Sequence, residues 1–240
     1  MRNIIYQPWG GLGDNLAHSI IPELCHQRGI KCFLSKQNAY RNQEIFDFIW
    51  GSNPYIEKEQ IDSTDLSWMN LGKQYEIGPL NHIQVLQKIY GFDTNYEYPK
   101  IYYSPKYIEE FKDKTLIDLT AHSAMQFFTI SNIKDQLTRL EIDKDNALYV
   151  THSEIPYSAN NDLIDSNYKT VDINNLSYYS DIISSCKRLI TLLSGQSTLA
   201  STIKHQTNSS VQIDVLTPSI CLPHPRYSYT FSNANHIETY

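Results

Sequence analysis

Two turns rich in glycine and hydroxyl residues are the parts of the chain best suited to chemistry. The first reads Gly10-Gly11-Leu12-Gly13-Asp14-Asn15-Leu16 and follows the short apolar run at 3–7. Glycines let the backbone approach a ligand without a Cβ clash, and a carboxylate beside them, Asp14, could act as a general base. Asp14 could equally be a plain helix cap, since aspartate is common there. The spacing is not that of the GxGxxG fingerprint, which disfavours a standard dinucleotide fold.

The second turn joins an apolar run to a helix of small residues. It reads Ser194-Gly195-Gln196-Ser197-Thr198. Hydroxyls and backbone N–H groups that converge at the start of a helix are suited to binding a diphosphate. A simple Ser/Thr cap is the alternative. One such turn falls in each half of the chain, and this pairing favours a ligand that both halves hold.

Alternating strands and helices must position these turns. In the first half, the sequence predicts a strand at 3–7, a helix at about 14–28 and a strand at 31–35, which together form a βαβ unit. Short helices at 44–50, 81–90 and 105–112 and a strand at 99–103 are also expected. In the second half, strands are expected at 115–120, 147–151, 169–173, 188–193 and 210–216, with helices at 131–140, 176–186 and 196–204.

This alternation predicts an α/β fold with parallel sheets covered on both faces. We expect two Rossmann-like domains whose sheets face a cleft, one at 1–113 on the acceptor side and one at 114–217 on the donor side. Residues 218–240 are rich in tyrosine and aperiodic, and are expected to form an irregular tail. Parallel sheets bind ligands at the carboxyl ends of their strands, so the loops there matter most.

Composition excludes several classes of protein. The 240 residues carry a net charge of −6, which argues against nucleic-acid binding driven by bulk charge. The chain has 18 tyrosines, 8 phenylalanines and 3 tryptophans, too many aromatic residues for a disordered chain. No apolar run is long enough to predict a transmembrane segment, and the N-terminus does not read as a signal peptide. The four cysteines lack metal-ligand spacing. We therefore expect a cytoplasmic protein, at most peripheral at the inner face of a membrane, without cofactor or metal.

The sequence also resembles a known family. The run GGLGDNL, followed by a helix with Pro22, and the segment at 174–203 resemble heptosyltransferase-type glycosyltransferases of the GT-B architecture. The resemblance extends loosely over residues 3–216, but specific motifs lie only in these two segments. At two positions the chain departs from the usual family pattern: Leu193 replaces an acidic residue and Thr198 replaces a histidine.

The resemblance implies an activity and roles for residues. A sugar would pass from a nucleotide-diphosphate donor to a hydroxyl of a glycan or lipid-linked glycan acceptor, without a metal ion. Asp14 would be the general base, and the turn at 194–198 would hold the donor diphosphate. Further candidates for substrate binding are residues of the first turn, residues that follow predicted strands, and one arginine that could bind an anionic acceptor through two hydrogen bonds. They are, in chain order, Gly11, Gly13, Asn15, Arg41, His122, His152 and Glu154.

Two other functions remain open from the sequence. A nucleotide-sugar hydrolase on the same fold would use Asp14 or His122 to activate water instead of an acceptor. A non-catalytic module that binds nucleotides or glycans would need neither residue as a base. The histidines and Arg41 could also be ordinary loop residues in contact with solvent.

Overall fold

The chain forms two compact units. The computed structural model describes residues 2–64, 80–121, 127–152, 168–219 and 229–239. Unit 1 takes in the chain up to Ser104, and unit 2 takes in Pro105–Pro223 and Tyr229–Tyr240. The domain borders after residues 113 and 217 stay predictions, because a compact unit need not be an independently folding domain.

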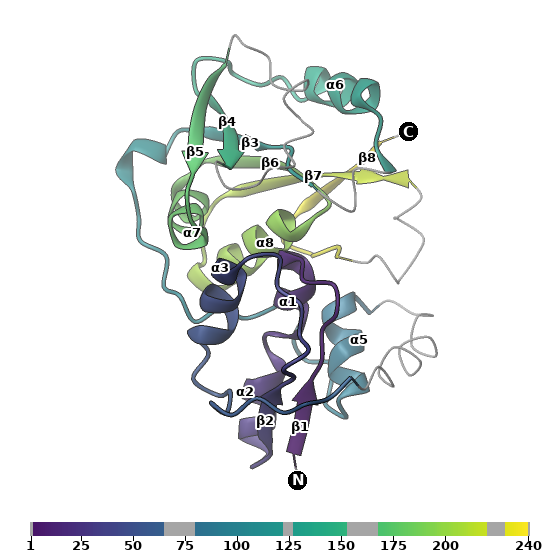
Figure 1. Ribbon diagram of the computed structural model, residues 1–240. Helices are drawn as coiled ribbons and strands as arrows, with labels where there is room; N and C mark the ends of the chain where they lie inside the picture. The colour runs from purple at the N-terminus through teal and green to yellow at the C-terminus, as the bar shows by residue number, and fades with distance from the viewer. Residues whose placement is uncertain (1, 65–79, 122–126, 153–167, 220–228, 240) are drawn as a thin grey trace. The chain divides into compact units, whose positions relative to one another are not determined.

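Unit 1 begins with a βαβ arrangement. Strands β1 (Arg2–Ile5) and β2 (Lys31–Leu34) pair in parallel, with Ile5 opposite Leu34. Helices α1 (Leu12–His18) and α2 (Ile21–Gln27) connect them (Figure 1). The single helix expected at 14–28 is wrong: the chain starts a new helix with Pro22 in its first turn. Proline is favoured there because its missing N–H has no partner within the helix in any case.

The rest of unit 1 is helical or irregular where it is described. Helix α3 (Gln43–Phe46) continues into a π-helical turn, η1 (Asp47–Gly51), and α5 spans His82–Ile89. The predicted strand at 99–103 is wrong. Side chains in α2 and just before it hydrogen-bond to this segment; for example, Lys100 N–H donates to Ser19 Oγ at 3.0 Å. The described part of unit 1 thus has a two-stranded sheet and one isolated bridge, Ser35 to Ile61.

Unit 2 is built on a six-stranded, fully parallel sheet. Its strands are β3 (Thr115–Asp118), β4 (Ala147–His152), β5 (Lys169–Ile173), β6 (Arg188–Leu192), β7 (Gln212–Pro218) and β8 (Asn235–Thr239), in the order β5-β4-β3-β6-β7-β8. In order along the chain this is the 3-2-1-4-5-6 arrangement of doubly wound folds. The α/β fold class with a parallel sheet is therefore confirmed for this unit.

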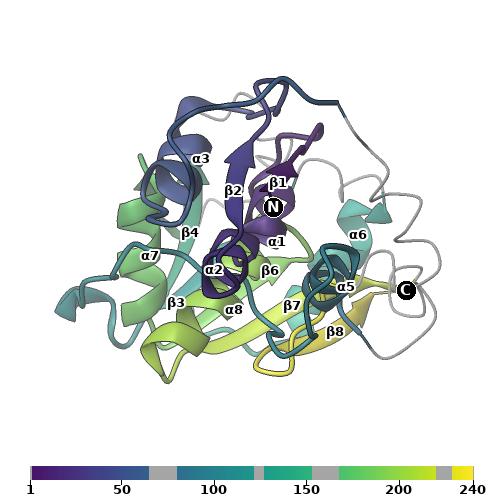
Figure 2. The same ribbon diagram turned by 90° about the horizontal axis from the view of Figure 1, so that it is seen from below.

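Three helices cover the two faces of this sheet. Helix α6 (Ile130–Arg139) lies on one face, and α7 (Leu176–Ser185) and α8 (Gly195–Thr207) lie on the other (Figure 1). Figure 2 views the sheet from the side of α7 and α8. Ahead of β3, the helix predicted at 105–112 is only a 3₁₀ turn, η2 (Glu109–Phe111).

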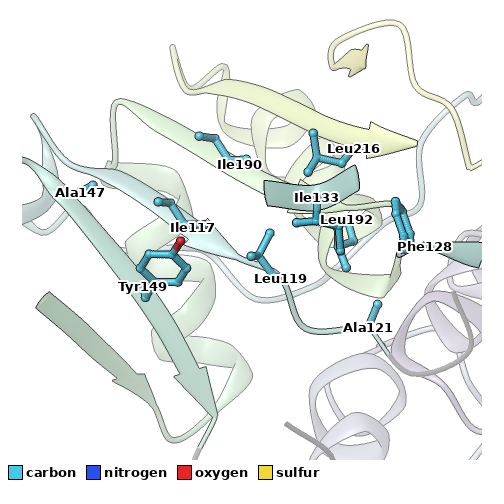
Figure 3. Packing of buried hydrophobic residues seen from close by; sticks show 10 residues of the cluster. All are labelled: Ile117, Leu119, Ala121, Phe128, Ile133, Ala147, Tyr149, Ile190, Leu192 and Leu216. Atoms are coloured by element: carbon cyan, nitrogen blue, oxygen red, sulfur yellow. The ribbon is translucent and has the colours of Figure 1, made fainter. Parts of the chain in front are cut away.

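The core beneath α6 shows how strand alternation builds the unit. Ile117, Ile190 and Leu216 come from three strands and pack with Ile133 of α6 (Figure 3). Neighbouring residues along each strand point to the opposite face, so Asp118 faces α7 and α8. This alternation places a polar side chain at the end of β3 on the face that carries the candidate site.

The tail contains a strand that the sequence does not reveal. Residues 218–240 were expected to be irregular, but β8 pairs in parallel with β7 from Asp214–Asn235 to Pro218–Thr239. Polar side chains help to fix this pairing, since Asn235 Nδ2 donates to Asp214 Oδ1 at 3.0 Å. The sequence NHIET has too few apolar residues to signal a strand, and its partner lies about twenty residues away.

Candidate functional site

The glycine turn of unit 1 holds a partly buried carboxylate. Gly11 is the N-cap of α1, and Asp14 lies in the first turn of that helix. Burial raises the pKa of Asp14 above its ordinary value, although a hydrogen bond from the backbone N–H of Gly11 and the charge of Arg41 oppose this. A carboxylate with a raised pKa accepts a proton more readily near neutral pH. The position can therefore support general-base chemistry.

Close backbone packing brings Arg41 to the same turn. Gly10 has a positive φ of 69°, which favours glycine, and a methyl group there would lie 3.2 Å from the backbone nitrogen of Arg41. Arg41 N–H donates to the Gly10 carbonyl at 2.9 Å. The loop is held further because Ala39 N–H donates to Gln7 O at 2.9 Å. The exposed guanidinium of Arg41 is thus anchored by its backbone, close enough to affect Asp14.

Asn15 supports this turn from within unit 1. It is fully buried. Its Nδ2 donates to the Gly11 carbonyl at 2.9 Å, and its Oδ1 accepts from Trp50 Nε1 at 2.8 Å. Both ends of the amide are therefore used inside unit 1, and the substrate contact of Asn15 stays a prediction. Gly13 lies in the first turn of α1 and is partly exposed.

The second turn lies at the carboxyl end of β6 and begins α8. Ser197 Oγ accepts from Ser194 N–H at 3.1 Å, and Thr198 Oγ1 donates to the Ser194 carbonyl at 3.2 Å. Ser197 and Thr198 are fully buried and their hydroxyls cap the helix, and their contact with substrate stays a prediction. Ser194, Gly195 and Gln196 are partly exposed and remain at the helix N-terminus.

The topology of unit 2 marks the place where a ligand is expected. β3 and β6 are neighbours at the centre of the sheet. The strands that follow β3 in the chain, β4 and β5, lie on one side of this pair, and those that follow β6, β7 and β8, lie on the other. Ligands of doubly wound folds bind outside the carboxyl ends of the strands at such a switch point. Asp118 ends β3, and Ser194 follows the end of β6. The switch point therefore has Ser194, which the sequence predicts as a site residue, after one strand and Asp118, which the sequence did not single out, at the end of the other.

Asp118 is a fully buried carboxylate with three partners. Its Oδ2 accepts from the Tyr179 hydroxyl at 2.5 Å and lies 3.1 Å from His152 Nε2, and its Oδ1 accepts from Thr120 N–H at 2.9 Å. Burial alone would raise the pKa of Asp118, but these bonds outweigh it and the pKa is lowered. An acidic residue ending an apolar run was the sequence signal that could have revealed this cluster.

Several sequence predictions fall outside this geometry. His122 and Glu154 lie outside the described residues. Within the described ranges, no group of three or more histidine, cysteine, aspartate or glutamate side chains could hold a metal ion. In the same part of the chain, no helix is both long and apolar enough to cross a membrane.

The fold is similar to solved structures of sugar transferases. TibC from enterotoxigenic E. coli, described as a dodecameric iron-containing heptosyltransferase in complex with ADP-D-β-D-heptose, shares 13% identity at a TM-score of 0.57, over 97% of this chain and 61% of TibC. A family 9 glycosyl transferase from Veillonella parvula DSM 2008 shares 11% identity at a TM-score of 0.55, over 99% of this chain and 85% of the transferase. The heptosyltransferase WaaC of E. coli, solved with ADP, shares 8% identity at a TM-score of 0.55, over 99% of this chain and 93% of WaaC.

These likenesses confirm the resemblance to heptosyltransferase-type glycosyltransferases at the level of the fold. The chain spans about three fifths of the length of TibC. No family model matches the sequence, and no curated protein matches it.

Proposed function

We propose that this protein is a glycosyltransferase that uses a nucleotide-activated sugar as donor. The observation that carries the proposal is the Asp14 carboxylate, which sits at a glycine turn with a raised pKa and a neighbouring guanidinium. The proposal is supported by the fold that the chain shares with heptosyltransferases, two of which are described with ADP-heptose or ADP.

In this proposal the donor binds unit 2 at the switch point. The N-terminus of α8 offers backbone N–H groups near Gly195 and Gln196, together with the positive end of the helix dipole. These groups would stabilise the negative charge that grows on the nucleoside diphosphate as it leaves. Protein groups would thus supply the charge stabilisation, so we propose that the reaction needs no metal ion.

Unit 1 would hold the acceptor, a glycan or lipid-linked glycan. The acceptor hydroxyl attacks the anomeric carbon of the donor sugar, and a new carbon–oxygen bond forms. The bond from the anomeric carbon to the diphosphate oxygen breaks, and its electron pair leaves with the diphosphate. The hydroxyl proton passes to Asp14. Arg41 would hold an anionic group of the acceptor. We propose a cytoplasmic setting, at the inner face of a membrane for a lipid-linked acceptor.

A donor screen tests the proposal. The protein is incubated with ADP-, GDP- and UDP-sugars, with and without glycan acceptors, and release of nucleoside diphosphate and transfer of sugar are measured. We expect transfer from at least one donor, and thermal stabilisation by the matching nucleotide. If no donor is turned over and no nucleotide stabilises the protein, the transferase proposal is wrong. Full-rate release of free sugar without acceptor would instead favour the hydrolase.

The role of Asp14 needs a matched control. Asp14→Asn should lower turnover by about 10²–10⁴-fold, the usual contribution of a general base. Asp47→Asn is the control, because Asp47 is an exposed aspartate of the same unit whose side chain, among the contacts described, accepts a hydrogen bond only from its helix neighbour Gln43. Turnover that survives Asp14→Asn undiminished would make Asp14 a helix cap.

A further inference from the structure

Trp9 is unusual among the large apolar side chains because half of its surface is exposed to solvent. Tryptophan is highly buried on average, since its large ring gains more from burial than most side chains do. Trp50, the other tryptophan that the structure describes, follows this rule: it is 2% exposed, and its Nε1 donates to Asn15 Oδ1. Packing of the core thus does not account for the exposed part of Trp9.

The backbone of Trp9 is held in place by a buried side chain. Its N–H donates to Gln7 Oε1 at 2.6 Å, and Gln7 is almost completely buried. Gln7 is fixed in turn through its own backbone, because its N–H donates to Asn38 Oδ1 at 2.7 Å and its carbonyl accepts from Ala39 N–H at 2.9 Å. The indole is therefore attached to an ordered main chain, so a ligand that packs on it loses little affinity to ordering of the loop.

Trp9 belongs to the same turn as the candidate base. Consecutive α-carbons are about 3.8 Å apart, so those of Trp9 and Gly11 are separated by at most about 7.6 Å. A Cβ on Gly11 would lie 2.6 Å from Asp14 Oδ2 and 3.9 Å from Arg41 Nη2. An exposed aromatic ring, a carboxylate and a guanidinium therefore come from one short stretch of unit 1 and the loop packed against it.

These three groups match the three parts of a pyranose ring that bears an anionic substituent. The C–H bonds of a pyranose form an apolar face, and the electron-rich face of an aromatic ring packs favourably against such C–H groups. A sugar hydroxyl can donate a hydrogen bond to a carboxylate. An anionic substituent can accept two hydrogen bonds from a guanidinium.

We propose that Trp9 is a specificity-determining residue of the acceptor site, whose indole packs against the apolar face of an acceptor pyranose that carries an anionic group. This inference rests on the proposed transferase function, since it adds a residue to the acceptor site of that reaction. The sugar ring lies on the indole, one of its hydroxyls reaches Asp14, and its anionic group binds Arg41. Trp9 thus selects a cyclic sugar over an open-chain molecule with the same polar groups.

NMR of the indole groups tests this contact without turnover. The probe is methyl β-D-glucuronide, because its equatorial substituents leave an apolar ring face and it carries a carboxylate. The indole N–H signal of Trp9, identified by its loss in Trp9→Phe, should shift during the titration while that of the buried Trp50 stays in place. D-Gluconate is the control ligand, since it has a carboxylate and hydroxyls but no ring face, and it should leave the Trp9 signal unchanged.

Two substitutions at this position connect the contact to acceptor binding. Trp9→Ala removes the ring but keeps the backbone hydrogen bond to Gln7, so it should fold. Its Kd for the glucuronide should rise about tenfold. Its KM for the acceptor found in the donor screen should rise equally, with kcat and the KM for the donor unchanged. Trp9→Phe keeps an aromatic ring and should recover most of the affinity.

Tyr96→Ala is the matched control for loss of an exposed aromatic ring. Tyr96 belongs to the same unit and is 38% exposed. Its backbone is also held by a buried glutamine, because its carbonyl accepts from Gln87 Nε2 at 2.6 Å and its N–H donates to Gln87 Oε1 at 3.2 Å. The substitution should change neither the Kd for the glucuronide nor the KM for the acceptor.

The outcomes separate this inference from the transferase proposal. An unmoved Trp9 signal, an equal response to gluconate, or a native acceptor KM in folded Trp9→Ala overturns the inference, and donor turnover by the native protein then leaves the transferase intact. Glucuronide binding through Trp9 without turnover of any donor supports the glycan site and refutes the transferase. If Trp9→Ala does not fold, the NMR titration of the native protein decides by itself.

Discussion

A methyl group on Gly11 should separate the catalytic role of Asp14 from its structural role. Gly11 has φ −71° and ψ 157°, a conformation that alanine adopts without strain. An added Cβ would lie 2.6 Å from Asp14 Oδ2. Ordinary contact begins at 3.4 Å, so the carboxylate must move by about 0.8 Å, and as the end of a flexible side chain it can do so.

The displacement should remove activity and leave the fold intact. A misplacement of about 1 Å in a catalytic group can cost about 10²-fold in rate, so Gly11→Ala should lower kcat by roughly that factor. Its unfolding free energy should stay within about 1 kcal/mol of the native value, because the loss of unfolded-state entropy offsets the local adjustment.

Alanine at two other glycines should have the opposite effect, a loss of stability without a loss of turnover. Gly29 and Gly91 have φ of 68° and 78°, and a methyl group on either would meet nothing within 4 Å. Alanine at these positions should cost about 1–2 kcal/mol of backbone strain while leaving kcat unchanged. Steady-state turnover and chemical unfolding of the three variants are the assays. A folded Gly11→Ala variant with native kcat would refute the placement of the base at Asp14.

Three further outcomes follow from the same structure. Gly10→Ala should lose more stability than Gly29→Ala, by about 1–3 kcal/mol in chemical unfolding, because its methyl group also presses on the Arg41 backbone; equal losses would contradict the close packing. His18 is fully buried and burial lowers its pKa to about 4, so the unfolded chain binds its proton first as pH falls. His18 should therefore contribute a loss of about 3 kcal/mol in unfolding free energy between pH 6.5 and 4, and His18→Gln should make the profile against pH shallower, while His82, whose pKa burial also lowers to about 4, keeps the remaining slope. Arg188→Gln should cost about 3–5 kcal/mol, measured by urea unfolding, because it strands the buried Asp214 carboxylate.

Local signals sufficed for most elements of unit 2. The strand predicted at 169–173 matches β5, and the helix predicted at 176–186 matches α7 within one residue. Each is a short segment whose own apolar spacing decides its conformation. Asn175 also caps α7 through its side chain, a signal carried entirely within four residues. Such elements can be predicted from sequence because the information lies within them.

Elements that depend on a distant partner were missed. β8 exists because β7 offers a free edge, and its own residues carry little strand signal. The segment at 99–103 fails to become a strand because Ser19 and Glu23 bind it, about eighty residues earlier in the chain. Neither outcome can be predicted from periodicity.

The same division applies to the candidate sites. The sequence by itself determined the two turns, because a strand end, glycines and a helix start are adjacent along the chain. It could not tell that Asn15, Ser197 and Thr198 are buried, since their partners are set by packing. Only the tertiary structure brings His152 and Tyr179 onto Asp118, across 34 and 61 residues. A buried charge must find its partners in space, and a parallel sheet supplies them from strands and helices far apart in sequence.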